Sequence, residues 1–183
     1  MKLYVMRHGP AEDDAASGRD YDRALTAAGR DRVTAVAKAL VEAGEAPYAI
    51  LSSPLVRAVE TAELVAEATH LTQITREDKK AQMGGATGGV EVRRELGMGT
   101  EKLALLAELV RSGRKRVMVV GHEPDLSMLV ASLVGVHPAL ASGMGKAMVV
   151  GVKLMPDPRV AGLEFRSTLR FVLDPKTLGW QRG

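Results

Sequence analysis

Residues 4–10 read YVMRHGP, in which a tyrosine, a valine and a methionine lead into an arginine, a histidine and a glycine. Residues 3–6 (LYVM) form a short apolar run near the start of the chain, which is typical of a buried strand. Arg7 and His8 follow this run at once. Because open α/β sheets bind ligands at the carboxyl ends of their strands, we predict that the strand delivers two nitrogen-rich side chains to a binding site.

The composition indicates a folded protein with its own core. The chain has 183 residues, of which 46% are hydrophobic and 26% are charged, the usual balance of a globular protein. A chain of this length is typical of one compact domain, so we expect a single domain over residues 1–183. The sequence holds no cysteine, which excludes disulfides, thiolate nucleophiles and cysteine-ligated metals.

The charge pattern argues against two classes of partner. The net charge is only +3, aromatic residues make up 3% of the chain, and the basic residues are scattered rather than clustered. Nucleic-acid binders usually gather basic residues on one face. No apolar run reaches the roughly 18 residues that a membrane span needs, and no signal-peptide pattern is present. We therefore expect a cytoplasmic protein that binds neither nucleic acid nor membranes.

Apolar runs alternate with helical segments along the chain. Thr26 is a suitable N-cap for a helix that Gly44 ends. A strand is predicted over residues 48–54, where Ser53 and Pro54 favour the start of a helix that reaches residue 69.

The second half continues the alternation. We predict a helix from Thr100 to Gly113, a strand over 116–122, a helix that begins at Glu123 and ends at Gly135, and a final hairpin of strands at 147–155 and 163–175. Residues 70–99 are predicted to be a loop with one short strand. Since parallel strands need crossover connections, the fold class is α/β: a three-layer α/β/α sandwich with a mostly parallel central sheet.

Three strand ends in this arrangement carry cationic or imidazole side chains. Arg7 and His8 follow the first strand, Arg57 lies in the first turn of the helix after the second, and His122 ends the strand at 116–122. Helical side chains lean toward the helix N-terminus, so the Arg57 guanidinium can reach back over the sheet edge. The four side chains are therefore expected to converge.

A phosphoryl group is the natural partner for such a cluster. Cations at close range repel one another unless an anion compensates them, and the planar guanidinium fork suits phosphate oxygens. A neutral imidazole can also attack phosphorus as a nucleophile. The residues thus predict phosphoryl transfer at His8.

Three segments resemble the signatures of a known family. MRHG (residues 6–9), SSPLVRAVETAELVAE (52–67) and VVGHEPDLSMLVASLVG (119–135) are similar to those of the histidine phosphatase, or phosphoglycerate mutase-like, superfamily. The small size, the short insert between the last two segments and the ending LRFVLDPKTL (169–178) most resemble its SixA branch of phosphohistidine phosphatases. The resemblance covers nearly the whole chain.

The resemblance implies roles for the four residues. His8 would be the phosphorylated nucleophile, and Arg7, Arg57 and His122 would form the phosphate pocket, with no metal and no other cofactor. The sequence departs from the family pattern in RALT at residues 23–26, where proline often precedes the leucine, and in Glu60, where glutamine is common.

The general acid and the substrate are left open by the sequence. Glu95, Glu12, Asp13 and Glu123 are the candidate acids, and the acidic stretch at 11–23 is either a solvated loop or a border of the substrate entrance. We expect a phosphohistidine substrate on a carrier or signalling protein, because the short segment between residues 68 and 99 leaves little material for a lid. The alternatives are a small phosphomonoester as substrate, or a non-catalytic module that senses a phosphorylated partner.

Overall fold

A seven-stranded sheet forms the centre of the computed structural model, which describes residues 1–71, 89–157 and 165–183. Its strand order is β3-β2-β4-β1-β5-β6-β7. The strands are β1 (Lys2–Arg7), β2 (Ala49–Ser52), β3 (Val90–Val92), β4 (Arg116–Gly121), β5 (Val149–Pro156), β6 (Phe165–Leu173) and β7 (Trp180–Arg182).

Strand β1 divides the sheet into two halves. On one side β1, β4, β2 and β3 pair in parallel, and on the other side β5, β6 and β7 continue the sheet with antiparallel pairing. The parallel half requires crossover connections, which the helices provide. The predicted α/β class with a mostly parallel core is confirmed.

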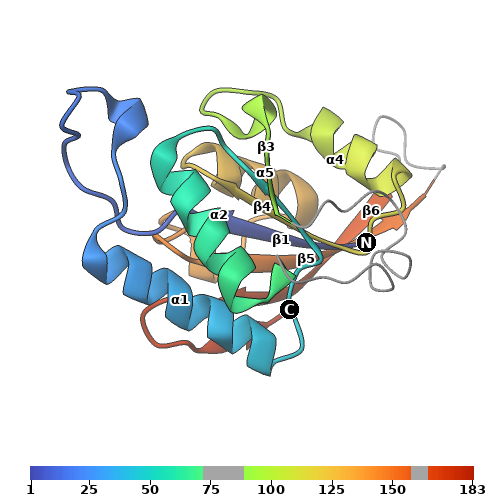
Figure 1. Cartoon of the computed structure of the whole chain (residues 1–183). Coiled ribbons are helices and arrows are strands. Elements are labelled where there is room, and N and C mark those ends of the chain that lie inside the picture. Colours follow the sequence, from blue (N-terminus) through green and yellow to red (C-terminus); the bar gives the residue numbers. More distant parts are fainter. Residues whose placement is uncertain (72–88, 158–164) are drawn as a thin grey trace.

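Helices cover both faces of the sheet. They are α1 (Ala27–Glu42), α2 (Val56–Ala68), α4 (Leu103–Arg111) and α5 (Asp125–Val134), with short 3-10 turns η1 (Asp20–Asp22), η3 (Arg94–Leu96) and η4 (Pro138–Leu140). Figure 1 shows α1 and α2 side by side across the sheet. Among the helices in the described part of the chain, none has the length and apolar character that a bilayer crossing demands.

The alternation of side chains along β1 explains the three layers. Tyr4 and Met6 are buried in the cluster that contains α1 and α2, whereas Leu3 and Val5 are buried in the cluster that contains α4 and α5. Successive strand residues point to opposite faces, so an apolar run without alternation needs cover on both. Full burial of each such side chain contributes roughly 1.5–3 kcal/mol.

The strands of the parallel half end together at one edge. Arg7 of β1 is in register with Gly121 of β4, and Ser52 of β2 is in register with Val120. The residues that follow these strands therefore meet at the same edge. In Figure 1 the segment between β1 and α1, drawn in blue, projects from this part of the molecule.

A close backbone contact closes that segment onto α1. Thr26 caps the helix as predicted, because its side chain accepts a hydrogen bond from the Gly29 backbone N–H at 2.9 Å. A Cβ atom at Gly29 would lie only 2.0 Å from the carbonyl oxygen of Pro10. Only glycine permits this approach, which brings the start of α1 against the residues after His8.

Several predicted boundaries differ from the structure. The helix predicted from Pro54 begins at Val56, after the N-cap residue Leu55, and the helix predicted from Thr100 begins at Leu103. In the first case Ser53 is not the N-cap residue, and its hydroxyl contacts His122 instead. The short strand expected within 70–99 is β3, residues 72–88 lie outside the described residues, and β7 was not predicted.

Candidate active site

The four predicted side chains meet at the sheet edge. Arg7 is the last residue of β1 and is followed by His8, His122 follows β4, and Arg57 is the second residue of α2. The ring centroids of His8 and His122 are 5.1 Å apart, and the charge of Arg57 acts on both imidazoles. His8, Arg57 and His122 are all buried.

A main-chain carbonyl fixes the orientation of the His8 ring. Nδ1 of His8 lies 2.7 Å from the carbonyl oxygen of Gly9. Because a carbonyl only accepts, we assign the ring proton to Nδ1, which leaves the lone pair on Nε2. Thr61 in turn accepts from the Gly9 N–H at 3.0 Å and donates to the carbonyl of Arg57 at 2.7 Å. Thr61, which the sequence did not single out, thus ties the His8 segment to α2.

The surroundings keep His8 uncharged. Burial is the main cause that lowers the pKa of His8 to about 3, and the charges of His122, Arg57 and Arg7 act in the same direction, while the hydrogen bond to Gly9 opposes them. A protonated imidazole has no lone pair on Nε2. The arrangement therefore holds His8 in the form that can act as a nucleophile.

The ring of His122 is held through Nε2, whereas the ring of His8 is held through Nδ1. Nε2 of His122 lies 2.7 Å from the hydroxyl oxygen of Ser53, while its Nδ1 is buried without a partner. Burial, followed by the charge of Arg57, lowers the pKa of His122 to about 4, and Asp20 acts in the opposite direction. The sequence singled out Ser53 as the N-cap of the helix, but Leu55 is the N-cap residue of α2, and the Ser53 hydroxyl instead orients His122.

Asp20 connects the loop of residues 11–23 to the site. Arg57 donates from Nη1 to the carbonyl oxygen of Asp20 at 2.8 Å and from Nη2 to its carboxylate at 3.0 Å. Burial acts to raise the pKa of the Asp20 carboxyl, but hydrogen bonds from Arg57 and Arg23 outweigh it and lower that pKa. The loop therefore places a carboxylate beside the cationic cluster.

Unpartnered nitrogens gather at the site. Within residues 1–71, 89–157 and 165–183, four buried side-chain nitrogens lack a hydrogen-bond partner, and three of them are Nε of Arg7, Nε of Arg57 and Nδ1 of His122. Buried polar atoms are normally paired. Three such nitrogens among cationic and imidazole groups suit the oxygens of a tetrahedral oxyanion.

The four candidate acids are placed elsewhere or are engaged. The Glu95 carboxylate pairs with Arg93 at 2.7 Å, which lowers its pKa, and Glu123 accepts a hydrogen bond from the Ser127 hydroxyl at 2.6 Å. Glu12 and Asp13 are exposed on the loop after β1. None of the four carboxylates is hydrogen-bonded or ion-paired to a site side chain, so the structure assigns no general acid among them.

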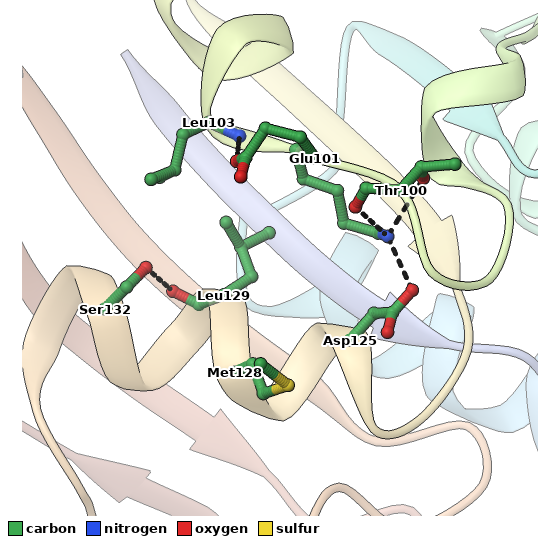
Figure 2. A pocket seen from close by; sticks show the side chains of 8 residues that line it. Thr100, Glu101, Leu103, Asp125, Met128, Leu129 and Ser132 are labelled. Atoms are coloured by element: carbon green, nitrogen blue, oxygen red, sulfur yellow. Dashed lines mark hydrogen bonds and ion pairs between the residues drawn. The ribbon is translucent and has the colours of Figure 1, made fainter.

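Two cavities differ in their relation to the site. One, of about 200 Å³, lies between residues 100–103 and α5 and is lined by Asp125 and Met128 (Figure 2). It includes none of the four predicted side chains. The other, of about 230 Å³, has Arg7 in its wall together with Met144 and Lys176. In the described ranges no group of three or more histidine, aspartate or glutamate residues could hold a metal ion.

Comparisons of the sequence identify relatives. The sequence profile of the histidine phosphatase superfamily (branch 1) matches residues 3–95. The chain is also 32% identical over 133 residues to the phosphohistidine phosphatase SixA of Escherichia coli, a match that covers 73% of this chain and 74% of that protein.

Comparisons of the structure agree with these matches. The structure of the protein histidine phosphatase SixA complexed with tungstate is similar, with a TM-score of 0.75, 26% identity and coverage of 98% of this chain and 100% of that one. A mycobacterial glucosyl-3-phosphoglycerate phosphatase shares the fold, with a TM-score of 0.60, 21% identity and coverage of 92% and 96%.

The pKa values of the two site histidines predict a pH-dependent stability. Both are lower in the fold, at about 3 and about 4, than the ordinary 6.5, so between these values the unfolded chain binds more protons. Stability is then complete above pH 6.5 and decreases as the pH falls. From pH 7 to pH 5 we expect a loss of about 1 kcal/mol or more for each histidine, measured by urea unfolding.

The chain's two other histidines provide the control. The variant His8→Gln/His122→Gln should lose most of this pH dependence, whereas His70→Gln/His137→Gln should keep it. An equal slope in both double variants would show that the site histidines are not its source.

The contact between Asp20 and Arg57 predicts an effect of loop charge on oxyanion binding. Asp20→Asn keeps an acceptor for Arg57 but removes a negative charge, so tungstate should bind more tightly, by about fivefold at low ionic strength. Asp14→Asn, on the same exposed loop, should change the affinity little. Calorimetric titration measures both, and weaker binding by Asp20→Asn would mean that the carboxylate chiefly orients Arg57.

Proposed function

The chain belongs to the histidine phosphatase superfamily, and on that basis we propose that it removes the phosphoryl group from phosphohistidine on a protein by way of a phosphorylated His8. The observation that carries the proposal is the hydrogen bond of 2.7 Å from His8 Nδ1 to the Gly9 carbonyl. It leaves Nε2 of a buried, neutral imidazole free to attack phosphorus.

In the proposed complex the phosphoryl oxygens lie against Arg7, Arg57 and His122. This assignment is supported by the unpartnered Nε atoms of the two arginines and by Nδ1 of His122. As the transferred group moves, its equatorial oxygens keep their negative charge, and fixed donors that match this charge lower the barrier. A phosphate dianion would also favour the protonated form of His122.

The placement of the four candidate acids favours a phosphoramidate over an ester as the substrate. An alkoxide leaving group needs a proton from a positioned acid, whereas an imidazole that is already protonated leaves as a neutral group. None of Glu95, Glu123, Glu12 and Asp13 is hydrogen-bonded or ion-paired to a site side chain. The described geometry thus suits a substrate whose leaving group is imidazole.

The position of Asp20 supports the same substrate class. Its carboxylate lies beside Arg57, and its charge acts against the overall lowering of the His122 pKa. A negative charge beside the site attracts the protonated ring of a phosphohistidine substrate and repels a substrate that carries its own carboxylate. Protonated phosphohistidine is favoured by this field, and glycerate phosphates are disfavoured.

The proposed reaction has two displacement steps. In the first, the Nε2 lone pair of His8 forms a bond to phosphorus while the bond from phosphorus to the substrate imidazole breaks. In the second, water forms a bond to phosphorus, both its hydrogens stay on the released phosphate, and the electron pair of the broken bond returns to His8 Nε2. The sum is hydrolysis of phosphohistidine to histidine and phosphate.

The nucleophile is tested by removing its imidazole. His8→Ala should lower kcat/KM by about 10³-fold or more, because it removes the group that forms the intermediate. Rapid acid-free quench of the wild type should trap phosphate in an acid-labile bond that is absent from the variant. His137→Ala, outside the site, should retain both the activity and the trapped phosphate.

Two results would contradict this mechanism in different ways. Turnover by His8→Ala at the wild-type rate would exclude His8 as the nucleophile. Tight binding of a phosphorylated protein by the wild type without turnover would instead identify a phosphate-sensing module.

The substrate is tested by comparing a phosphohistidine-bearing carrier protein with glycerate and sugar phosphates. We expect kcat/KM to be at least about 100-fold higher for the carrier, since the esters need a general acid that contributes roughly 10²–10⁴-fold. Asp20→Asn should reduce the difference in kcat/KM between the carrier and glycerate phosphate more than the difference between the carrier and a neutral sugar phosphate. Higher activity on the esters would identify a small-molecule phosphomonoesterase.

A further inference from the structure

Arg7 is held by a part of the chain that lies far from it in sequence. Its Nη1 donates to the carbonyl oxygen of Met144 at 2.7 Å. We infer that Ser127 and Glu123, at the start of α5, are positioning residues that fix the Arg7 guanidinium through the Met144 peptide. The inference rests on the proposed role of Arg7 in binding the phosphoryl group.

Two hydrogen bonds connect Glu123 to the Met144 backbone, and a third connects that backbone to Arg7. Glu123 Oε2 accepts from the Ser127 hydroxyl at 2.6 Å, and the Ser127 oxygen accepts from the Met144 backbone N–H at 3.0 Å. The peptides on both sides of Met144 are thereby engaged, the N–H by Ser127 and the carbonyl by Arg7. The order from carboxylate to guanidinium is Glu123, Ser127, Met144, Arg7.

The direction of each bond follows from the donors available. A serine hydroxyl has a single proton, and the carboxylate of Glu123 can only accept it. The remaining lone pairs of Ser127 are then the ones that face the Met144 N–H. By accepting the hydroxyl proton, Glu123 leaves Ser127 as an acceptor for the Met144 N–H. A serine hydroxyl that rotated freely would not hold this orientation.

A left-handed turn brings the Met144 segment close enough for these contacts. Gly143 has φ +83, and a Cβ atom there would lie 2.8 Å from Glu123 Oε2. The turn is closed by a hydrogen bond of 2.9 Å from the Gly143 N–H to the Leu140 carbonyl. Glycine allows both this conformation and the approach to the carboxylate.

The same segment also holds the main chain around Arg7. The Arg7 N–H donates to the Met148 carbonyl at 3.2 Å, and the Ala147 N–H lies 3.2 Å and 3.1 Å from the carbonyls of Arg7 and His8. The Met144 side chain is buried in the core. A shift of this segment would therefore move the guanidinium relative to the strand that carries it.

The contacts of Glu123 separate into a local and a distant branch. Its Oε1 accepts from the Ser127 backbone N–H at 3.2 Å, which stabilises the first turn of α5 in the usual way of an acidic side chain at a helix start. The distant branch runs through the Ser127 hydroxyl. Ser127→Ala removes the distant branch and keeps the backbone N–H of the local one, so the two can be tested apart.

A double-mutant cycle on tungstate binding tests the inference. Ser127→Ala should weaken tungstate binding by about tenfold, the scale of one charge-assisted hydrogen bond, and Arg7→Ala should weaken it more. If Ser127 acts through Arg7, adding Ser127→Ala to Arg7→Ala should cause no further loss. Glu123→Gln, which keeps one acceptor oxygen for the Ser127 hydroxyl but loses the charge and the second acceptor, should weaken binding by about threefold.

The same helix offers a matched control. The Ser132 hydroxyl donates to the Leu129 carbonyl within α5 (Figure 2). Ser132→Ala should leave tungstate affinity unchanged. Urea unfolding of each variant identifies losses that come from destabilisation, and Glu123→Gln carries the test if Ser127→Ala does not fold.

The outcomes separate this inference from the proposed function. Wild-type affinity in both Ser127→Ala and Glu123→Gln, or an equal loss with and without Arg7, would overturn the positioning role while leaving the phosphate pocket intact. A wild type that does not bind tungstate would overturn the proposed pocket itself.

Discussion

Two guanidinium groups and two imidazoles share one edge of the sheet, where burial and the guanidinium charges keep both imidazoles neutral, and this constraint shapes the contacts around them. Neutral main-chain carbonyls hold three of the four side chains. The carbonyl of Gly9 holds His8, that of Met144 holds Arg7, and that of Asp20 holds Arg57. A carbonyl fixes the direction of a donor without cancelling its charge, so the positive potential at the edge is preserved for an anion. Within the described residues, the carboxylate that is ion-paired to this group of side chains is that of Asp20, which lies on an exposed loop.

Burial has opposite consequences for stability and for chemistry at this edge. Desolvation keeps His8 and His122 neutral, which makes a nucleophile available. It also lowers the stability of the fold below pH 6.5, because the unfolded chain can protonate and hydrate both imidazoles whereas the folded chain cannot. Sites of this kind are commonly less stable than an apolar replacement would be. The apolar residues of β1, packed on both faces, provide the rigid support that such a site needs.

The sequence was most informative where local pattern decides structure. Apolar runs and caps such as Thr26 predicted the order of strands and helices, and strand ends identified Arg7, His8, Arg57 and His122. The sequence could not predict contacts between loops and distant elements: Asp20 on Arg57, Ser53 on His122, or Met144 on Arg7. Such contacts depend on tertiary geometry and leave no periodic signal. Strand β7 was missed because a three-residue strand is defined by its neighbour β6 and not by its own composition.

The reversal of direction at β5 has a consequence for what constitutes a complete site. Because β5 runs antiparallel to β1, it begins at the edge where β1 ends. The segment that precedes β5 therefore lies at the same edge as the residues that follow β1. The four site residues all precede Glu123. A fragment that stops after α5 would nevertheless lack the Met144 carbonyl that holds Arg7 and the strand β5 that flanks β1. The minimal unit that preserves the geometry therefore extends through β5, well past the last of the four site residues.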